Sequence, residues 1–234
     1  MSPARHERID MAVFGPLPGF ARAAVRLRGI DATRGAAPAA ALCRRAAAAA
    51  AAAPPPTGAL WAAAYEVVGL PADTLPPHVA LDAWARAPGG VPTQGPLLDL
   101  VHATALRHGV PAAAYDLAAV TGDLWLRPAR GVELFAPPGA APDAAPINEL
   151  ILADGADRVM ARAWHGAQSA DTRVGPGATE VLVHFDLLAE GEEAPAEAAA
   201  ALAASFAQLA TGFVGGAADV RVLTRAAPQA AWPA

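Results

Sequence analysis

The chain has 234 residues, of which 54% are hydrophobic and 17% charged, and this composition indicates a globular protein and excludes a disordered one. Its formal net charge of −5 at pH 7 argues against broad, sequence-independent binding of nucleic acid, although it does not exclude a local basic patch. The single cysteine, Cys43, excludes an internal disulfide and any cysteine-based metal site.

The N-terminal part of the chain is charged and rich in arginine. Residues 1–10 carry charged side chains and no long apolar segment follows them, so we expect no signal peptide and a cytoplasmic protein. No stretch approaches the roughly 20 apolar residues of a membrane span. Residues 22–30 alternate as a strand does. All 17 basic residues of the chain are arginines, which is typical of a GC-biased genome and also suits planar phosphate contacts.

Four helices are predicted in the next part of the chain, over residues 37–53, 58–70, 77–86 and 95–108. The first is rich in alanine. In the second, Trp61, Tyr65 and Val68 recur at helical spacing. The fourth has Pro96 in its first turn and Gly109 just past its end, which are the residues that favour a helix start and a helix stop.

Strands dominate the second half of the chain. They are predicted near residues 123–128, 149–154, 158–164, 180–187 and 218–224, with one long helix near 195–210. Helices followed by strands and a helix favour an α+β fold, a single domain with a largely antiparallel sheet flanked by helices. We expect residues 1–57 to belong to the same domain as the central part, 58–225, and residues 226–234 to form a frayed tail.

Several short motifs follow one another in the central part. A helix with Asp99 and His102 leads into Gly109, Pro111 and the pair Tyr115-Asp116. A strand over 122–127 and the string Trp-His-Gly-Ala-Gln-Ser over 164–169 come next, and a Thr-Glu entry into a strand over 179–186 closes the series. This order resembles the B3/B4 editing domain of the phenylalanyl-tRNA synthetase β-subunit over roughly residues 58–188. It is most similar to the free-standing members, which carry a tryptophan at the start of the turn.

The resemblance implies hydrolysis of a mischarged aminoacyl-tRNA in trans, which needs no metal, no cofactor and no serine or cysteine nucleophile. The site would hold the 3′ aminoacyl end of tRNA and position a water molecule. The catalytic residues implied are His102, His184 and Asp99, and those implied in substrate binding are Trp164, His165, Gly166, Ser169 and Asp186. If tRNA is the partner, Arg26, Arg28 and Arg34 are expected to contact its phosphates.

This sequence departs from the family pattern at three positions. His102 replaces the helix asparagine, Ala113 stands where the synthetase has a histidine, and His184 stands where it has a glutamate. These departures bear on the reaction rather than on the fold.

Each candidate residue also has a plain structural interpretation. Asp99 and His102 share a helix face. The carboxylate either orients a functional imidazole, or the two residues form an ordinary surface pair or a buried tertiary hydrogen bond. Trp164 stacks on a ligand or caps the core, and His184 faces a cleft or a solvated sheet face. Arg107 and His108 are interpreted as surface groups that suit a helix C-terminus.

Three functions remain open from the sequence alone. The first is a trans-acting aminoacyl-tRNA deacylase. The second is an enzyme on the same scaffold that acts on a small amino-acid-derived metabolite, and the third is a non-catalytic binding module for tRNA or a ligand. A basic track leading from the cleft would favour tRNA, whereas a closed, apolar pocket would favour a small substrate. The sequence does not predict the oligomeric state.

Overall fold

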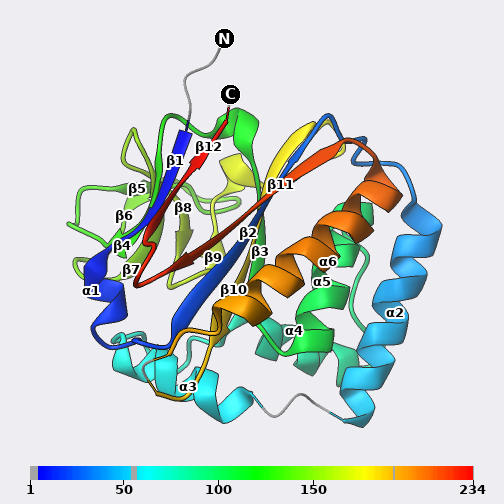
Figure 1. The fold of residues 1–234 in the computed structure, drawn as a ribbon, viewed down its shortest axis with the longest axis horizontal. Helices are drawn as coiled ribbons and strands as arrows, with labels where there is room; N and C mark the ends of the chain where they lie inside the picture. The colour runs from blue at the N-terminus through cyan, green and yellow to red at the C-terminus, as the bar shows by residue number, and fades with distance from the viewer. Residues whose placement is uncertain (1–4, 54–56, 192, 234) are drawn as a thin grey trace.

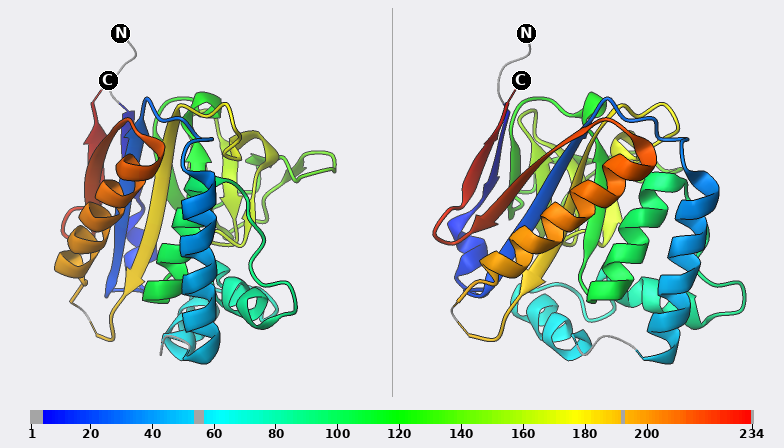
Figure 2. Two further views of the ribbon diagram at one scale, coloured as in Figure 1. Left: turned by 90° about the vertical axis from the view of Figure 1, so that its right-hand side faces the viewer. Right: turned by 45° about the vertical axis from the view of Figure 1, so that its right-hand side comes forward.

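Two β-sheets pack face to face, and helices cover the outer face of one of them (Figure 1). The computed structural model describes residues 5–53, 57–191 and 193–233. In the left panel of Figure 2, the second sheet, sheet B, lies between helix α6 (Ala196–Val214) and the yellow-green strands β5 to β8 of the first, sheet A. The two largest apolar cores lie on either side of sheet B, one between the two sheets and the other between sheet B and the helices.

Sheet B has the strand order β11-β2-β10-β3, and its three pairings are antiparallel. Its strands are β2 (Phe20–Arg28), β3 (Ala112–Asp116), β10 (Glu180–Leu188) and β11 (Ala217–Thr224). Side chains alternate between its faces, so Val183 and Phe185 face the helices whereas His184 and Asp186 face sheet A. Both faces of β10 are therefore buried.

Sheet A has the order β12-β1-β4-β7-β8-β5-β6, with β9 paired to β8. Its strands are β1 (Arg5–Ile9), β4 (Leu124–Pro128), β5 (Leu134–Phe135), β6 (Asp143–Ala144), β7 (Leu150–Asp154), β8 (Arg158–Arg162), β9 (Ala167–Gln168) and β12 (Gln229–Trp232). The pairings β1–β4 and β5–β8 are parallel and the others are antiparallel.

The helices divide between two positions. Helices α5 (Pro96–His108) and α6 pack on sheet B, and α2 (Ala36–Ala52) packs against α5. Helix α4 (Pro77–Arg86) lies against α2 and α5, whereas α3 (Gly58–Val67) buries Trp61 and Tyr65 in the core between the sheets. The short α1 (Met11–Phe14) contacts β4. Helix α5 begins at Pro96 and ends before Gly109, whose left-handed φ of 62° is favoured at a helix C-terminus.

The α+β fold with antiparallel sheets and flanking helices is confirmed, and each long helix and strand expected from the sequence is present within a few residues. Strands β1 and β3 are absent from the sequence prediction. The expected frayed tail was wrong in part, because Gln229–Trp232 forms β12, which pairs with β1. Burial of the Trp232 indole, which is 1% exposed, stabilises this strand.

Helix α6 is long and apolar enough to cross a membrane by length and composition alone. In the structure its apolar face packs on sheet B through residues such as Leu202 and Phe206. The ring of Phe206 lies 4.8 Å from that of Phe185 on β10. This packing accounts for part of the hydrophobicity of α6, since 39% of its apolar stretch is buried.

We expect Trp232→Ala to lower the free energy of unfolding by about 3–5 kcal/mol, because it removes a buried indole and leaves a cavity. Denaturant unfolding followed by circular dichroism measures the change. Trp84→Ala is the matched control. Because Trp84 is 45% exposed, this substitution should change the free energy of unfolding by no more than about 0.5 kcal/mol. Equal unfolding midpoints for the two variants would contradict the role of β12.

Candidate functional site

Seven side chains form a buried group between the two sheets, which we call the inter-sheet polar cluster. They come from β1, β2, β3, β10 and the turn after β8, and they are between 0 and 7% exposed. The members are Glu7, Arg22, Tyr115, Trp164, His165, His184 and Asp186. Four of these were expected in the site from the sequence, namely Trp164, His165, His184 and Asp186, and the structure brings these four together.

Asp186 is the centre of the cluster. Arg22 donates to both of its carboxylate oxygens, from Nε at 2.7 Å and from Nη2 at 2.8 Å. The indole Nε1 of Trp164 donates to Oδ2 at 2.7 Å, and Nε2 of His165 lies 3.1 Å from the same oxygen. Burial raises the pKa of Asp186, but the Arg22 guanidinium outweighs it and holds this pKa below its ordinary value. The carboxylate is therefore charged at neutral pH.

His165 links Asp186 to Tyr115. Its Nδ1 lies 2.5 Å from the Tyr115 hydroxyl. Burial lowers the pKa of His165 to about 4 and raises that of Tyr115, so both groups are neutral at pH 7. In one tautomer the phenol donates to Nδ1 and the Nε2–H donates to Asp186. In the other, Nδ1–H donates to the phenol and Nε2 accepts from Nη2 of Arg22, which lies 3.1 Å away.

Glu7 and His184 form a second buried pair. Nε2 of His184 lies 3.0 Å from Oε1 of Glu7, and Nη1 of Arg22 lies 3.7 Å from the same oxygen. Burial raises the pKa of Glu7, but His184 and Arg22 outweigh it and lower this pKa below its ordinary value. Arg22 thus connects the two carboxylates, one from each sheet.

The turn that carries Trp164 and His165 has an unfavourable backbone. Ala163, Trp164 and His165 have φ values of 47°, 46° and 69°, and the left-handed conformation costs a residue with a side chain roughly 1–2 kcal/mol. Hydrogen bonds hold it in place, since the Trp164 carbonyl accepts from the Tyr65 hydroxyl at 2.8 Å and its amide donates to Leu150 at 3.0 Å. Strained residues of this kind cluster at functional sites.

His102 and Asp99 do not join this cluster. They lie on α5, which packs on the opposite face of sheet B from Trp164 and His184. Burial lowers the pKa of His102 to about 4. Their catalytic role, and that of the buried His184, stays a prediction.

The other expected site residues lie at separate places. Gly166 is exposed, whereas Ser169 is 3% exposed and lines a small cavity of about 180 Å³ beside β8. Arg26 pairs with Glu180 at 2.5 Å, and Arg28 with Asp219 at 2.9 Å. Arg34 is exposed, and no ion pair involves it in the part of the chain that the structure describes.

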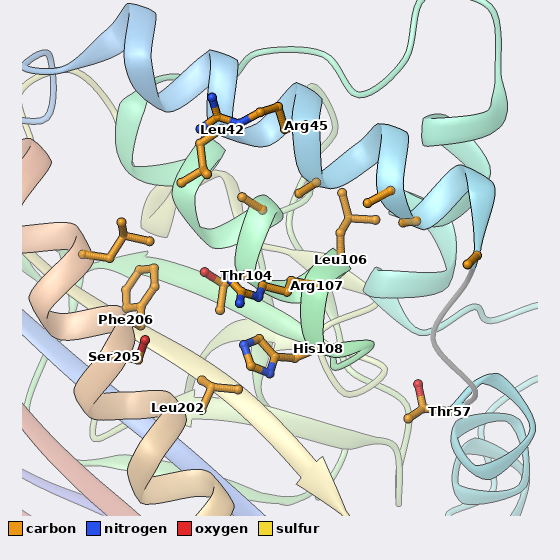
Figure 3. A pocket seen from close by; sticks show the side chains of 16 residues that line it. Leu42, Arg45, Thr57, Thr104, Leu106, Arg107, His108, Leu202, Ser205 and Phe206 are labelled. Atoms are coloured by element: carbon orange, nitrogen blue, oxygen red, sulfur yellow. The ribbon is translucent and has the colours of Figure 1, made fainter.

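A larger cavity of about 820 Å³ lies among α2, α5 and α6, and we call it the helical cavity (Figure 3). In Figure 3, Arg45 on α2 lies across it from Ser205 and Phe206 on α6, with Arg107 and His108 of α5 between them. Its volume is that of a small-molecule site. Most of its remaining lining is apolar, including Leu42, Ala46, Ala49, Ala50, Ala53, Ala103, Leu106, Leu202 and Leu209.

The charges of the helical cavity have one sign. Arg45 and Arg107 line it, and no aspartate or glutamate does so among the described residues. Within residues 5–53, 57–191 and 193–233, no side-chain hydrogen bond or ion pair holds Arg45, Arg107 or His108. Burial and the neighbouring Arg107 lower the pKa of His108, which favours a neutral imidazole. The cavity therefore attracts an anion and holds a base.

The sequence analysis missed these residues. Arg107 and His108 stand in the last turn of α5, where interaction with the helix dipole already explains a basic residue. Arg45 stands among alanines on α2, and its partners across the cavity come from a helix far along the chain. No local motif marks the set.

No family model matches this sequence, and no curated protein matches it. Among solved structures, the chain is similar to an N-terminal fragment of the phenylalanyl-tRNA synthetase β-subunit from Pyrococcus horikoshii, with a TM-score of 0.47 and 12% sequence identity. The similarity covers 91% of this chain and 49% of that chain, so this chain spans about half the length of the fragment. At this identity, the roles of individual side chains rest on their own geometry.

The neutral His165 predicts a specific dependence of stability on pH. Its folded pKa of about 4 lies below the unfolded value of 6.5, so the unfolded chain binds more protons between these values and stability falls as pH falls through that window. We expect His165→Asn to reduce the slope of the free energy of unfolding against pH by up to about 1.4 kcal/mol per pH unit. Asparagine is chosen because it tolerates the left-handed backbone of this position.

Denaturant unfolding of wild type and variant from pH 4 to pH 8 measures the two slopes. Above pH 7, where His165 keeps one protonation state, the two slopes should coincide and serve as the internal control. A variant slope equal to that of wild type between pH 4 and 6.5 would show that His165 does not titrate as its burial requires.

Proposed function

We propose that the chain is an ester hydrolase that acts on an aminoacyl group in the helical cavity, with the 3′ end of a mischarged tRNA as the substrate. The observation that carries this proposal is the composition of the cavity, in which an apolar lining adjoins two arginines and a histidine and, within the described residues, no carboxylate.

Such a cavity is complementary to an aminoacyl ester of a nucleotide. The phosphates of the terminal nucleotides carry the negative charge that Arg45 and Arg107 attract. The amino-acid side chain finds apolar surface on Leu106 and Phe206. Thr104 and Ser205 add hydroxyl groups at the same wall.

His108 is the group suited to the chemistry. As a neutral imidazole it accepts a proton from water while that water attacks the ester carbonyl carbon. The bond from this carbon to the ribose oxygen then breaks, and the imidazolium returns the proton to the leaving oxygen. Arg107, next to His108, stabilises the negative charge that develops on the carbonyl oxygen.

The ordered motifs from Asp99 to Asp186 resemble those of free-standing B3/B4 editing proteins and motivate the choice of an aminoacyl ester as the substrate, whereas the reacting groups proposed here lie in the helical cavity. A proofreading step of this kind belongs in the cytoplasm, where charged tRNA is used. The inter-sheet polar cluster is closed to solvent, and we assign to it the positioning of the sheets.

A second candidate is the same hydrolysis on a small amino-acid-derived ester that is not linked to tRNA. It is favoured by Arg26 and Arg28, whose charges are already paired with Glu180 and Asp219 and are therefore less available to phosphates.

We expect His108→Gln to lower the rate of aminoacyl-ester hydrolysis by about 10²–10⁴-fold, the contribution of a general base. Wild-type activity should rise with pH and level off at an inflection below 6.5, because burial and Arg107 lower the pKa of His108. Arg107→Gln should move this inflection upward, since it removes a like charge. His6→Gln is the control, because His6 is an exposed histidine on β1 of sheet A and does not line the helical cavity. An unchanged rate in folded His108→Gln protein would exclude this base.

The dependence on salt separates the two candidate substrates. If tRNA is bound, its affinity should fall with salt, and Arg45→Gln should reduce the slope of log K against log salt by about 0.7–0.9, because the variant neutralises one phosphate fewer. Arg28→Gln is the matched control, because Arg28 is paired with Asp219. Filter binding and deacylation across a salt series, beside hydrolysis of a free aminoacyl ester, provide the measurement. Salt-independent turnover of the free ester alone would favour the small substrate.

A further inference from the structure

Cys43, Asp99 and His102 meet at the contact between α2 and α5. One ligand-type atom of each, the Cys43 sulfur, a carboxylate oxygen of Asp99 and a ring nitrogen of His102, lies within 4.8 Å of the other two. Asp99 and His102 are three residues apart and share a helix face, and Cys43 approaches them from the neighbouring helix. This cluster is separate from both the helical cavity and the inter-sheet polar cluster.

Two polar atoms of this cluster have no hydrogen-bond partner among the described residues. Asp99 is 0% exposed; its Oδ1 accepts the Gln94 amide hydrogen at 3.1 Å, while its Oδ2 has no hydrogen-bond partner among the described residues. The buried Nδ1 of His102 likewise has none within that part of the chain. A buried carboxylate oxygen and a buried ring nitrogen without partners are costly, so the arrangement points to a bound group that satisfies both.

Burial also shifts the protonation of all three residues. It raises the pKa of Cys43 to about 11, raises that of Asp99 above its ordinary value and lowers that of His102 to about 4. In each case burial favours the neutral form. A cation among these groups reverses the preference of the two acids, because it stabilises the thiolate and the carboxylate, and it leaves the imidazole neutral.

We propose that Cys43, Asp99 and His102 bind a divalent metal ion of the zinc class, through Sγ, Oδ2 and Nδ1. A thiolate with an imidazole and a carboxylate is a donor set that suits Zn²⁺ or Co²⁺ rather than Mg²⁺ or Ca²⁺. The two negative ligands balance the charge of the ion. Three protein ligands leave the fourth tetrahedral position for water or a small ligand.

The sequence analysis excluded a cysteine-based metal site because the chain has a single cysteine. The structure supplies the other two ligands from a helix that begins more than fifty residues later, so one cysteine is sufficient. Arg44, next to Cys43 in the sequence, is exposed, and its charge opposes but does not outweigh the effect of burial on the pKa values of Cys43 and Asp99.

Cobalt binding tests this proposal without an assay of activity. The full-length protein, freed of metal by a chelator, is titrated with Co²⁺ and followed by absorption spectroscopy. We expect a thiolate-to-cobalt charge-transfer band and the intense visible bands of four-coordinate cobalt, both abolished by Zn²⁺. Because Cys43 is the single cysteine of the chain, a thiolate band identifies it without any substitution.

The variants assign the remaining ligands. Cys43→Ser, Asp99→Asn and His102→Gln should each weaken cobalt binding by at least about 10²-fold, the upper range for loss of an outer partner of a metal ligand. His108→Gln, on the same helix, should bind cobalt as wild type does even where it loses hydrolysis, so the two proposals fail separately. Absence of the thiolate band in wild-type protein, or binding that Asp99→Asn and His102→Gln leave unchanged, would overturn the proposal.

Discussion

The ion pair between Arg22 and Asp186, on neighbouring strands of sheet B, is the buried interaction to which the contacts between the two sheets attach. Both side chains are 0% exposed, and a buried charge that loses its partner costs roughly 3–5 kcal/mol. The same carboxylate accepts from Trp164 and lies beside His165, so the pair also holds the turn after β8 in its left-handed conformation. Glu7 and His184 extend the charge pairing to β1 of sheet A, which lies between β12 and β4.

Much of the fold follows from local sequence. The alternation of β10 and the proline and glycine at the ends of α5 give those elements within a residue or two. Strand β1 was not predicted, because charged residues predominate in its sequence and the partners that make Glu7 tolerable in the interior are His184 and Arg22, on other strands. Strand β3 was missed because its alanines favour a helix and are uncommon in strands, and its place in the sheet depends on pairing with β10.

The candidate sites were predictable to different degrees. Trp164, His165, His184 and Asp186 were expected together from the order of motifs, and they meet. His102 was expected beside them, but sheet B intervenes, and the side on which a helix packs is set by long-range contacts that a single sequence does not reveal. The same limit hid the cavity residues Arg107 and His108, whose neighbours on α2 and α6 come from distant parts of the chain.

The alanines of α2 have a consequence for how ligand choice changes over evolution. Ala46 and Ala49 present only methyl groups to the helical cavity, and neither takes part in the pairing of either sheet. Replacement of one by a larger residue would fill part of the space while the sheets and their buried charges stay as they are. The size of the accepted ligand is thus adjustable at single positions of one helix, independently of the interactions that keep the protein folded.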